Sequence, residues 1–518
     1  MPDRPPIGET SRARTARALV ARHGWWIAIA VAYLYVFPYF PRIHSANELP
    51  RVYLTRAMVD DGTFAIDRGV RRWGATADVS PARGHQYSNK APGSSMLAVP
   101  GYALLRLVDR DPSLAASVWV CRVVAGILPM LAFLLLLARS LERFAPTPAV
   151  RRLVLVAYAL GSMAMTYSIL FYSHQLGAIC IASAWLLALD VADGQRRLRV
   201  MLAVGALAGA APLADYQAVF AALPVAVHVL VRLVRGRSRG ELARALGLAV
   251  AGASVPIAIL LTYHAICFGS PLATGYDAST TFAHFHQQGF LGITQLRWVA
   301  FEGSLVRPDN GLFTLAPWLL LALPGGVVLW RCGERGTALV ALATSVVFVA
   351  FVSSINFWRG GWGVGPRYIT ALLPFLLPPV AALLERVRAR PLVLGALASS
   401  IVVGVGVYAL AAVTFPYWPD SLANPFAEVT LRMLGDGLVA GSLGAALGVG
   451  GVIGVLPYLL VVAGALGTAL ARAAGPRGLV VAVVLGGLIL AGYTQLPRSP
   501  RAHGERVYGV VRAAVRDV

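Results

Sequence analysis

Long apolar segments recur from residue 24 to residue 493, and most of them end in arginine or in clusters of proline and glycine. Segments of about 17 to 25 residues cross the hydrocarbon core of a bilayer as α-helices, which satisfy every backbone polar group internally. Charged residues make up 13% of the chain, roughly half their share in an ordinary soluble domain. No pattern of short alternating strands is visible. The sequence therefore predicts an all-α polytopic membrane protein.

We expect about thirteen transmembrane helices separated by polar turns. They cover residues 24–42, 113–138, 153–171, 175–192, 198–214, 217–234, 243–267, 311–330, 337–354, 368–385, 391–414, 450–472 and 478–493. Residues 436–472 are apolar and rich in glycine, and they fit either one long span or two short ones. Thirteen spans leave the tail after Gln495 outside the cell, whereas fourteen leave it inside.

Arginine is concentrated in alternate turns between these segments. Five arginines precede the first span, and turns such as RSLERFAPTPAVRR and LERVRARP are rich in arginine, whereas FYSHQ and ADYQ contain none. Because positively charged loops stay in the cytoplasm, we expect a basic cytoplasmic N-terminus over residues 1–23. These loops also explain the formal net charge of +21, so no nucleic acid partner is expected.

The first external segment, residues 43–112, opens with a predicted short helix in HSANELPRVYLTRAMVDDG. Ser45 or Asn47 is a suitable N-cap, Pro50 is tolerated in the first turn, and Gly62 can end the helix. Glu48 lies at the beginning of this helix and Arg51 one turn later. The two could form a surface ion pair, or they could belong to a functional site.

Lys90 is the only lysine in the chain, and it lies in the sequence YSNKAPGSS. Residues 91–108 are too short and too interrupted to span the membrane, so they predict a helix that lies in the interface. The backbone N–H groups at the beginning of a helix favour an anion. Lys90 is therefore a candidate phosphate ligand, and the alternative is an isolated solvated lysine.

The order N-E-x-x-R, M-x-x-D-G and K-A-P-G over residues 45–100 resembles the first external loop of the GT-C glycosyltransferases. It is similar in particular to the branch of the lipid A aminoarabinose transferases and protein O-mannosyltransferases. The resemblance implies an inverting transferase that moves a sugar from a polyprenyl-phosphate donor to a hydroxyl of an envelope glycan, lipid or protein. It also implies a multi-pass protein of the bacterial inner membrane whose active site faces the periplasm or the cell exterior.

The resemblance also implies a domain organisation. The expected GT-C-like bundle has about thirteen helices, with juxtamembrane helices in its first external loop. Residues 24–414 form the expected catalytic module, which includes the external loops 43–112 and 268–310. A C-terminal transmembrane region, 415–493, and an Arg-rich tail, 494–518, follow.

Two residues carry over directly from the family pattern. Glu48 matches the second member of the acidic pair and Lys90 matches the lysine at the end of the loop, so Lys90 is expected to hold the donor phosphate. Asn47 stands where the family usually has its catalytic aspartate, and an amide cannot act as a general base. Either Glu48 or Asp78 is then the expected base, although Asp78 is also a typical turn residue.

Further candidates come from positions at the external ends of the spans. Arg359 and Arg367 in WRGGWGVGPRY are expected to help Lys90 bind phosphate, since arginine outside the membrane runs against the usual bias. The expected substrate-binding residues are Asn47, Arg51, His85, Tyr87, His174 and Asp215. A divalent metal such as Mg²⁺ or Mn²⁺ is a possible cofactor, and His284 and His286 form a weak metal motif without a third ligand.

Two other classes of function fit the same sequence. A transporter or lipid flippase would place ionisable groups and broken helices near the middle of the membrane, but the polar residues here are concentrated in the external loops. An inactive GT-C-like scaffold for envelope assembly is compatible with Asn47. Transport of a substrate without a covalent product would identify the first alternative.

Overall fold

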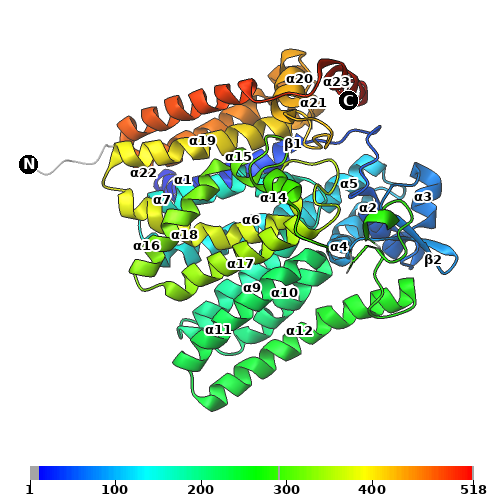
Figure 1. Ribbon diagram of the computed structural model, residues 1–518, viewed down its shortest axis with the longest axis horizontal. Helices are drawn as coiled ribbons and strands as arrows, with labels where there is room; N and C mark the ends of the chain where they lie inside the picture. Colours follow the sequence, from blue (N-terminus) through cyan, green and yellow to red (C-terminus); the bar gives the residue numbers. More distant parts are fainter. Residues whose placement is uncertain (1–10, 287, 290–291, 516–518) are drawn as a thin grey trace, which may run out of the picture.

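The computed structural model describes residues 11–286, 288–289 and 292–515, with side chains from residue 23 onward (Figure 1). Residues 1–10 of the predicted N-terminal segment, residue 287, residues 290–291 and residues 516–518 of the predicted tail lie outside this description. In the described part of the chain, strands form only two short antiparallel pairs. These are β1 (Val36–Phe37) with β4 (Gly441–Ser442), and β2 (Val79–Ala82) with β3 (His85–Ser88).

Long apolar helices make up the body of the molecule, as the sequence predicts. Eight helices of the described chain are long and apolar enough to cross a membrane, and a bent pair, α7 and α8, makes a ninth. The elements of the body are α1 (Ser11–Tyr35), α5 (Leu114–Arg122), η2 (Val123–Ile127), α6 (Leu128–Ser140), η3 (Leu141–Arg143), α7 (Pro148–Leu160), α8 (Met163–Ile169), α9 (His174–Ala192), α10 (Val200–Ala214), η4 (Tyr216–Ala221), α11 (Ala222–Gly236), α12 (Arg239–Phe268), α15 (Leu312–Leu315), η5 (Pro317–Leu321), α16 (Ala322–Arg331), α17 (Arg335–Ser354), η6 (Arg367–Leu372), α18 (Leu373–Val387), α19 (Pro391–Val413) and α22 (Gly451–Gly492). The protein is therefore an all-α polytopic membrane protein.

Helix α22 is two helices joined by a sharp turn. Gly475 has φ 67° and ψ 179°, which breaks the helix before Pro476. Gly395 and Gly406 of α19 lie against Gly478 and Leu490 respectively, so the second half runs parallel to α19. In the first half, Tyr458 donates a hydrogen bond to the carbonyl of Ala409 near the far end of α19. The two halves therefore form an antiparallel hairpin.

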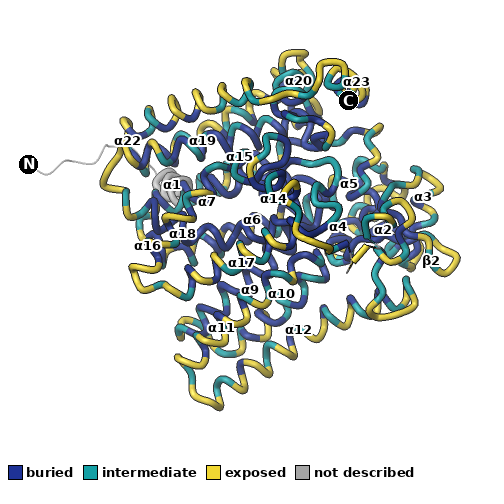
Figure 2. Tube along the Cα trace, viewed as in Figure 1, coloured by how far each residue is buried: buried dark blue, intermediate teal, exposed yellow. Residues whose placement is uncertain are grey.

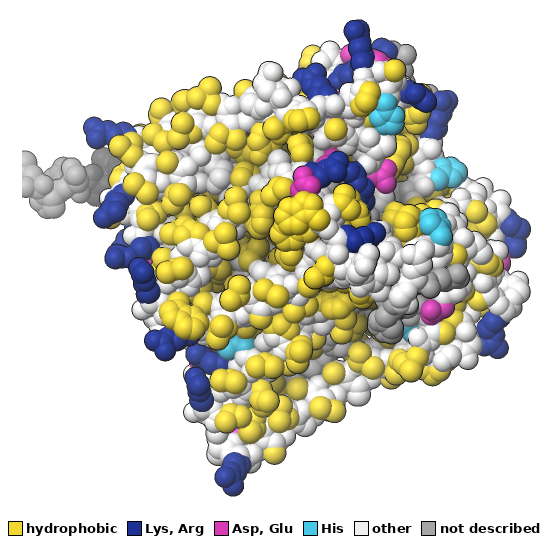
Figure 3. All heavy atoms as spheres, in the orientation of Figure 1, with side chains coloured by type: hydrophobic (Ala, Val, Ile, Leu, Met, Phe, Trp, Pro, Cys, Tyr) yellow, Lys and Arg dark blue, Asp and Glu magenta, His cyan; other side chains and the backbone are white. Residues whose placement is uncertain are grey.

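Helices in the centre of the body are buried on all sides, whereas outer helices present apolar side chains (Figures 2 and 3). The most apolar window of α9 is 89% buried and that of η6–α18 is 83% buried, compared with 22% for α12 and 28% for α22. An apolar exterior of this kind is stable only against lipid tails, so α12 and α22 face the bilayer.

The predicted helices of the first external segment are both present. The first comprises α2 (Leu49–Arg56) and η1 (Ala57–Asp61), and it ends at Gly62 with φ 64°. The interfacial helix is α4 (Gly93–Val108). The N-cap prediction was wrong, because Glu48 occupies the N-cap without a side-chain cap, and the Ser45 hydroxyl instead accepts from the Glu48 N–H at 3.4 Å.

Polar loops gather at the end of the molecule that carries α2 and α4, on the right in Figure 1. The remaining elements at this end are α3 (Asp67–Trp73), α13 (Ala283–His286), α14 (Trp298–Leu305), η7 (Phe426–Leu431), α20 (Arg432–Gly435), α21 (Leu443–Ala446), η8 (Tyr493–Gln495) and α23 (Arg501–Val515). The Ser80 hydroxyl donates to the carbonyl of Gly275 at 2.6 Å, so the two large loops contact each other. Turns at the opposite end are rich in arginine, which Figure 3 shows along its left edge.

Helix α1 begins earlier and ends earlier than the sequence predicts. It starts within the segment expected to be the cytoplasmic N-terminus and stops at Tyr35, where Val36 and Phe37 pair with Ser442 and Gly441. Strand pairing and Pro38 end the helix, because proline removes a donor and disfavours helix in the residue before it. The expected span of 24–42 is thus displaced toward the N-terminus.

Helices α10 and α12 cross at glycines that allow their backbones to touch. A Cβ atom on Gly252 would lie 2.0 Å from the carbonyl oxygen of Leu202, whereas a Cβ atom on Gly247 of the same helix would meet nothing within 4 Å. We predict that Gly252→Ala destabilises the protein by about 1–3 kcal/mol through overpacking. Gly247→Ala is the matched control, since alanine is the better helix former.

Thermal unfolding of the purified protein in detergent measures the difference between these variants. We expect a lower Tm for Gly252→Ala and an equal or higher Tm for Gly247→Ala. An unchanged Tm for Gly252→Ala would show that α12 does not pack closely on α10.

Candidate active site

A cavity of about 330 Å³ lies among the loops at the α2–α4 end of the molecule. Its wall is drawn from six parts of the chain: residues 43–47, Asp78 at the start of the β2–β3 hairpin, Tyr172 after α8, Phe282 of the second external loop, the glycine-rich segment 357–367 and the loop after α19. Three residues expected from the sequence line it: Asn47, Asp78 and Arg367. The structure thus brings together segments that are more than 300 positions apart in the sequence.

Lys90 is buried beside this cavity and is not a solvated lysine. Its Nζ atom lies 2.9 Å from Oδ1 of Asp78 and 5.3 Å from the centre of the Tyr276 ring. The β2–β3 hairpin produces this pairing, because the N–H of Asn89 donates to the carbonyl of Asp78 where the two strands meet. Burial lowers the pKa of Lys90 to about 8, although the neighbouring Asp78 carboxylate opposes the shift.

Arg367 is a buried cation without a carboxylate partner. Its guanidinium donates to the carbonyls of Gly360 and Trp362 and stacks over the rings of Tyr172 and Tyr368, with 5.4 and 5.6 Å to their centres. Its Nε atom is buried and has no hydrogen-bond partner in the described structure. Because an unpaired buried charge is costly, an anion in the cavity would stabilise Arg367.

Arg51 is a second buried guanidinium of this kind. It donates to Ser173 Oγ at 2.8 Å, to the carbonyl of Asn47 at 2.6 Å and to Oδ1 of the same asparagine. No carboxylate oxygen of a described residue lies within 4.0 Å of either Arg51 or Arg367. Burial lowers the pKa of Arg51. The site therefore carries an excess of positive charge.

Glu48 has no acceptor capacity left for catalysis in this structure. Oε1 accepts from Arg122 Nε at 2.9 Å and from the Phe171 N–H at 2.6 Å; Oε2 accepts from Arg122 Nη2 at 2.9 Å and from the Tyr417 hydroxyl at 2.5 Å. A carboxylate offers about four lone pairs, and these donors occupy all of them. Glu48 is buried, pairs with Arg122 rather than Arg51, and holds the first loop against three other segments.

Asp78 is the better-placed carboxylate of the two candidate bases. It lines the cavity, and its described contacts to Lys90 and Asn89 both involve Oδ1. Asp420, in the loop after α19, is a second carboxylate residue on the cavity wall. Asn47 also lines the cavity, and its side-chain oxygen accepts a hydrogen bond from Arg51.

Arg359 is separated from the cavity by its own partners. Its guanidinium pairs with the carboxylate of buried Asp309, donates to the carbonyl of Asp420 and stacks 5.0 Å from the Trp358 ring. An arginine already neutralised by a buried aspartate has little affinity left for phosphate. The geometry therefore favours Arg367 over Arg359 as a phosphate ligand.

His174 and Asp215 form a buried pair, and neither residue lines the cavity. Nδ1 of His174 lies 2.9 Å from Oδ2 of Asp215, and Nε2 has no hydrogen-bond partner among the described residues. Tyr172 and Tyr368 pack edge-on against the imidazole. Ser173, the residue before the histidine, bonds Arg51 and lies 3.1 Å from the Ser94 hydroxyl of α4. The pair thus supports the cation cluster from within the membrane body.

His85 and Tyr87 do not reach the cavity, contrary to their expected role. They lie on strand β3, where side chains alternate between two faces. The His85 ring bonds Asp67 at 2.9 Å on the protein surface, and Tyr87 packs against Phe268 with 5.9 Å between ring centres. Both residues line a separate surface pocket beside α12.

The residues around the cavity do not fit a divalent metal ion. No three His, Cys, Asp or Glu side chains of the described chain are close enough to hold one. Asp78 is paired with Lys90, and His286 lies against the Tyr276 ring with 4.5 Å between centres. Burial lowers the pKa of His286 to about 4. His284 packs on Phe285 and does not form a metal-ligand set with His286.

A second, apolar cavity of about 600 Å³ includes Gly93 in its wall, next to Ser94, whose hydroxyl lies 3.1 Å from the Ser173 hydroxyl that accepts from Arg51. It runs between α4, α6, α9, α10 and α12, and its walls include Gly93, Leu176 and Ala214. These three residues follow Lys90, His174 and Leu213 closely in the sequence. A Cβ atom on Gly93 would lie 2.6 Å from the Leu213 carbonyl, so glycine allows α4 to approach α10 at the mouth of the cavity.

Comparisons with known proteins add two structural similarities. No protein-family model matches the chain, and no curated protein matches it in sequence. The structure of ArnT from Cupriavidus metallidurans bound to undecaprenyl phosphate aligns with 94% of this chain and 78% of its own, at 16% identity and a TM-score of 0.43. The structure of the same ArnT in the apo state aligns with 93% of this chain and 78% of its own, at 16% identity and a TM-score of 0.47.

Sequence reasoning did not select Tyr417 or Asp420, and it interpreted Arg122 only as an arginine of the second span that snorkels or pairs with another helix. Arg122 carried a usable signal, because an arginine within an apolar span is rare and is generally paired. Tyr417 and Asp420 carried none, since aromatic and acidic residues in a loop are common. Their placement depends on how the loop after α19 folds back over the first external segment.

The Glu48–Arg122 pair predicts a large stability effect. Removal of one partner from a buried ion pair leaves the other charge unpaired, which costs about 3–5 kcal/mol. We therefore expect Arg122→Met to lower the Tm in detergent strongly. The control is Arg72→Met, which removes an exposed pair to Asp111 with 39% and 62% exposed side chains and is expected to change the Tm little. Similar Tm values for the two variants would contradict the structural role of Arg122.

Proposed function

We propose that this protein is an integral membrane glycosyltransferase of GT-C type that takes its sugar from a polyprenyl-phosphate donor. The acceptor in this proposal is a hydroxyl of an envelope glycan, lipid or protein, and the site faces the periplasm or the cell exterior. The proposal draws on the residues of the first external loop that resemble this superfamily. ArnT, the protein in the two similar structures, has been crystallised with undecaprenyl phosphate.

The observation that carries the proposal is a group of three buried cations around one cavity: Arg367 lines it, and Lys90 and Arg51 contact the wall residues Asp78 and Asn47. Lys90 has a single carboxylate partner, and Arg51 and Arg367 have none among the described residues. A phosphate group offers several acceptor oxygens to such a cluster, and bonds between guanidinium and phosphate are among the strongest in proteins. Cationic groups aimed at a leaving phosphate also stabilise the charge that develops on it in the transition state.

The reaction requires one displacement at the anomeric carbon. The acceptor oxygen forms a bond to that carbon while the bond from the carbon to the phosphate oxygen breaks, which inverts the configuration. The electron pair leaves with the polyprenyl phosphate, whose charge Arg367, Arg51 and Lys90 would balance. The acceptor proton passes to a carboxylate, and Asp78 is the candidate that geometry favours over Glu48.

The ion pair between Lys90 and Asp78 indicates the order in which the steps of this reaction occur. Before the donor binds, the lysine neutralises the aspartate at 2.9 Å. A donor phosphate competes for the ammonium group, which has rotatable donors on a flexible stem. Transfer of Lys90 to the phosphate would release Asp78 to accept a proton. A Lys90→Arg variant keeps the charge but changes this geometry, so reduced turnover is expected.

The apolar cavity beside Gly93 is a suitable place for the polyprenyl chain. Its walls are apolar along α6, α9 and α10, and they include Gly93, three residues after Lys90. A chain of isoprene units would bury its surface there while its phosphate reached the cation cluster. The arrangement allows one amphiphilic donor to occupy both cavities.

Transfer assays on charge variants test the proposal. We expect Arg367→Met and Arg51→Met to lower the rate of sugar transfer about ten- to a hundredfold, since each removes a charged hydrogen bond to phosphate. Asp78→Asn should lower it at least about a hundredfold, the usual contribution of a general base. Arg71→Met, an exposed charge in the same external segment, is the matched control and should retain full activity.

Product analysis separates the proposal from its rivals. Mass spectrometry of envelope lipids, glycans and proteins, with and without the protein, should reveal a sugar that depends on it. Movement of a labelled lipid across liposomes without a glycosylated product would identify a flippase. Wild-type protein that yields no product from any polyprenyl-phosphate sugar tested would favour a scaffold, whereas an active Asp78→Asn would refute only the choice of base.

The pKa of Lys90 predicts a pH dependence of the transfer rate. Because this pKa is lowered to about 8, the ammonium form predominates below that pH and is lost above it. The value of kcat/KM, which reports groups in the free enzyme, should therefore fall about tenfold per pH unit at higher pH. Arginine stays charged throughout this range, so Lys90→Arg should lack the decline even if its overall rate is lower. An identical decline in the variant would assign it to another group.

A further inference from the structure

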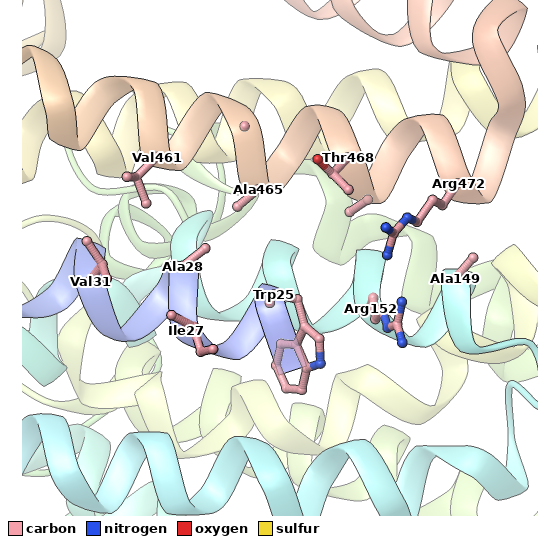
Figure 4. Close-up of a pocket in the computed structure, with 13 residues that line it drawn as sticks. Trp25, Ile27, Ala28, Val31, Ala149, Arg152, Val461, Ala465, Thr468 and Arg472 are labelled. Atoms are coloured by element: carbon pink, nitrogen blue, oxygen red, sulfur yellow. The ribbon is translucent and has the colours of Figure 1, made fainter. Parts of the chain in front are cut away.

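A third cavity, of about 480 Å³, lies between α1, α7 and α22 at the end of the molecule opposite the candidate active site. Its polar end is formed by Arg152 and Arg472, together with Thr468 and the indole of Trp25. Figure 4 shows the two arginine side chains reaching toward each other from α7 and α22, with Trp25 beside them. Nothing in the proposed glycosyl transfer uses these residues.

The position of this cavity along the membrane normal follows from the helices that form it. Arg152 lies in the first turns of α7, and the same bent span leads through α8 to Phe171, whose N–H binds Glu48. Arg472 lies three residues before the turn at Gly475 that joins the halves of α22. Both arginines are therefore at the interface on the Arg-rich side, which the positive-inside rule assigns to the cytoplasm.

Two like charges face each other here, and no carboxylate of a described residue compensates them. In the described part of the chain, neither Arg152 nor Arg472 has a carboxylate oxygen within 4.0 Å or a side-chain hydrogen bond. Repulsion between neighbouring guanidinium groups is relieved most directly by an anion between them. A phosphodiester matches two guanidinium groups well, because each can donate two N–H bonds to its oxygens.

The rest of the cavity is apolar and open toward the lipid. Ile27 and Val31 of α1 are 45% and 42% exposed, and Val461 and Ala465 of α22 lie opposite them (Figure 4). Glycine at position 464 leaves open space, since a Cβ atom there would meet nothing within 4 Å. A hydrocarbon chain fits this wall, whereas a soluble phosphate would use only the arginine end.

We propose that this cavity binds an anionic glycerophospholipid of the Arg-rich leaflet, with the phosphate between Arg152 and Arg472 and an acyl chain along α1 and α22. Basic pockets between transmembrane helices on the cytoplasmic side bind anionic head groups by this chemistry. The lipid would hold the α22 hairpin against α1 and α7. This inference is independent of the glycosyl transfer proposed above.

Native mass spectrometry of the full-length protein tests the inference with phosphatidylglycerol and phosphatidylcholine of identical acyl chains. Wild-type protein should retain phosphatidylglycerol under activation that removes phosphatidylcholine. The double variant Arg152→Gln with Arg472→Gln should bind phosphatidylglycerol roughly thirtyfold more weakly, the effect of two juxtamembrane charges. The control is Arg386→Gln with Arg390→Gln, two exposed arginines in the last turn of α18 and in the turn after it, and it should bind as the wild type does.

Two further arms keep the outcome unambiguous. Gly464→Leu preserves both arginines but fills the apolar wall, so it should also weaken phosphatidylglycerol binding, and thermal unfolding confirms that each variant is folded. Glycerol 3-phosphate should not displace the bound lipid. Wild-type affinity in the double variant, equal retention of phosphatidylcholine or displacement by glycerol 3-phosphate would each overturn the inference.

Discussion

The ion pair between Glu48 and Arg122 is the interaction on which the arrangement of the external loops depends. It joins the beginning of the first loop to the second long span, and the same carboxylate binds the N–H of Phe171 and the hydroxyl of Tyr417. Four segments are therefore fixed around one buried carboxylate. A charge in this position is stable only when its lone pairs are filled, and the structure meets that requirement within the protein itself.

The cluster of Lys90, Arg51 and Arg367 differs from this ion pair, because carboxylates of the described residues do not balance all of its charges. Asp78 balances Lys90, but Arg51 and Arg367 have only neutral acceptors among the described residues: Ser173, Asn47, Gly360 and Trp362. Glu48 has all of its acceptor positions filled, whereas neither guanidinium group has a carboxylate partner among the described residues. Glu48 stabilises the arrangement of the loops, whereas Arg51 and Arg367 are available to bind an anion.

Sequence reasoning predicted the parts of this picture that depend on local properties. Span lengths, arginine-rich turns and the Pro50 and Gly62 signals led to the correct fold class and to the helices of the first loop. The sequence also singled out Lys90, Asp78, Asn47 and Arg367 one by one. It predicted neither the pairing of Lys90 with Asp78 nor the burial of Arg51, because both depend on how the β2–β3 hairpin and the second external loop pack.

For a similar reason, the role of Glu48 could not be predicted from the sequence around it. Its partners Arg122 and Tyr417 lie 74 and 369 positions away in the sequence, and no pattern near Glu48 indicates them. His85 and Tyr87 are close to Lys90 in the sequence, yet strand β3 places both at a separate pocket beside α12. Distance along the chain was thus a poor guide to distance in the site.

The most direct test of the account is a structure of the protein in a lipid nanodisc with a polyprenyl-phosphate-linked sugar. The account predicts phosphate density bounded by Lys90, Arg51 and Arg367, with Nζ of Lys90 turned from Asp78 toward a phosphate oxygen and the hydrocarbon chain entering the cavity beside Gly93. Phosphate bound elsewhere, with the Lys90–Asp78 pair intact and the cavity beside Arg367 filled only by water, would contradict it.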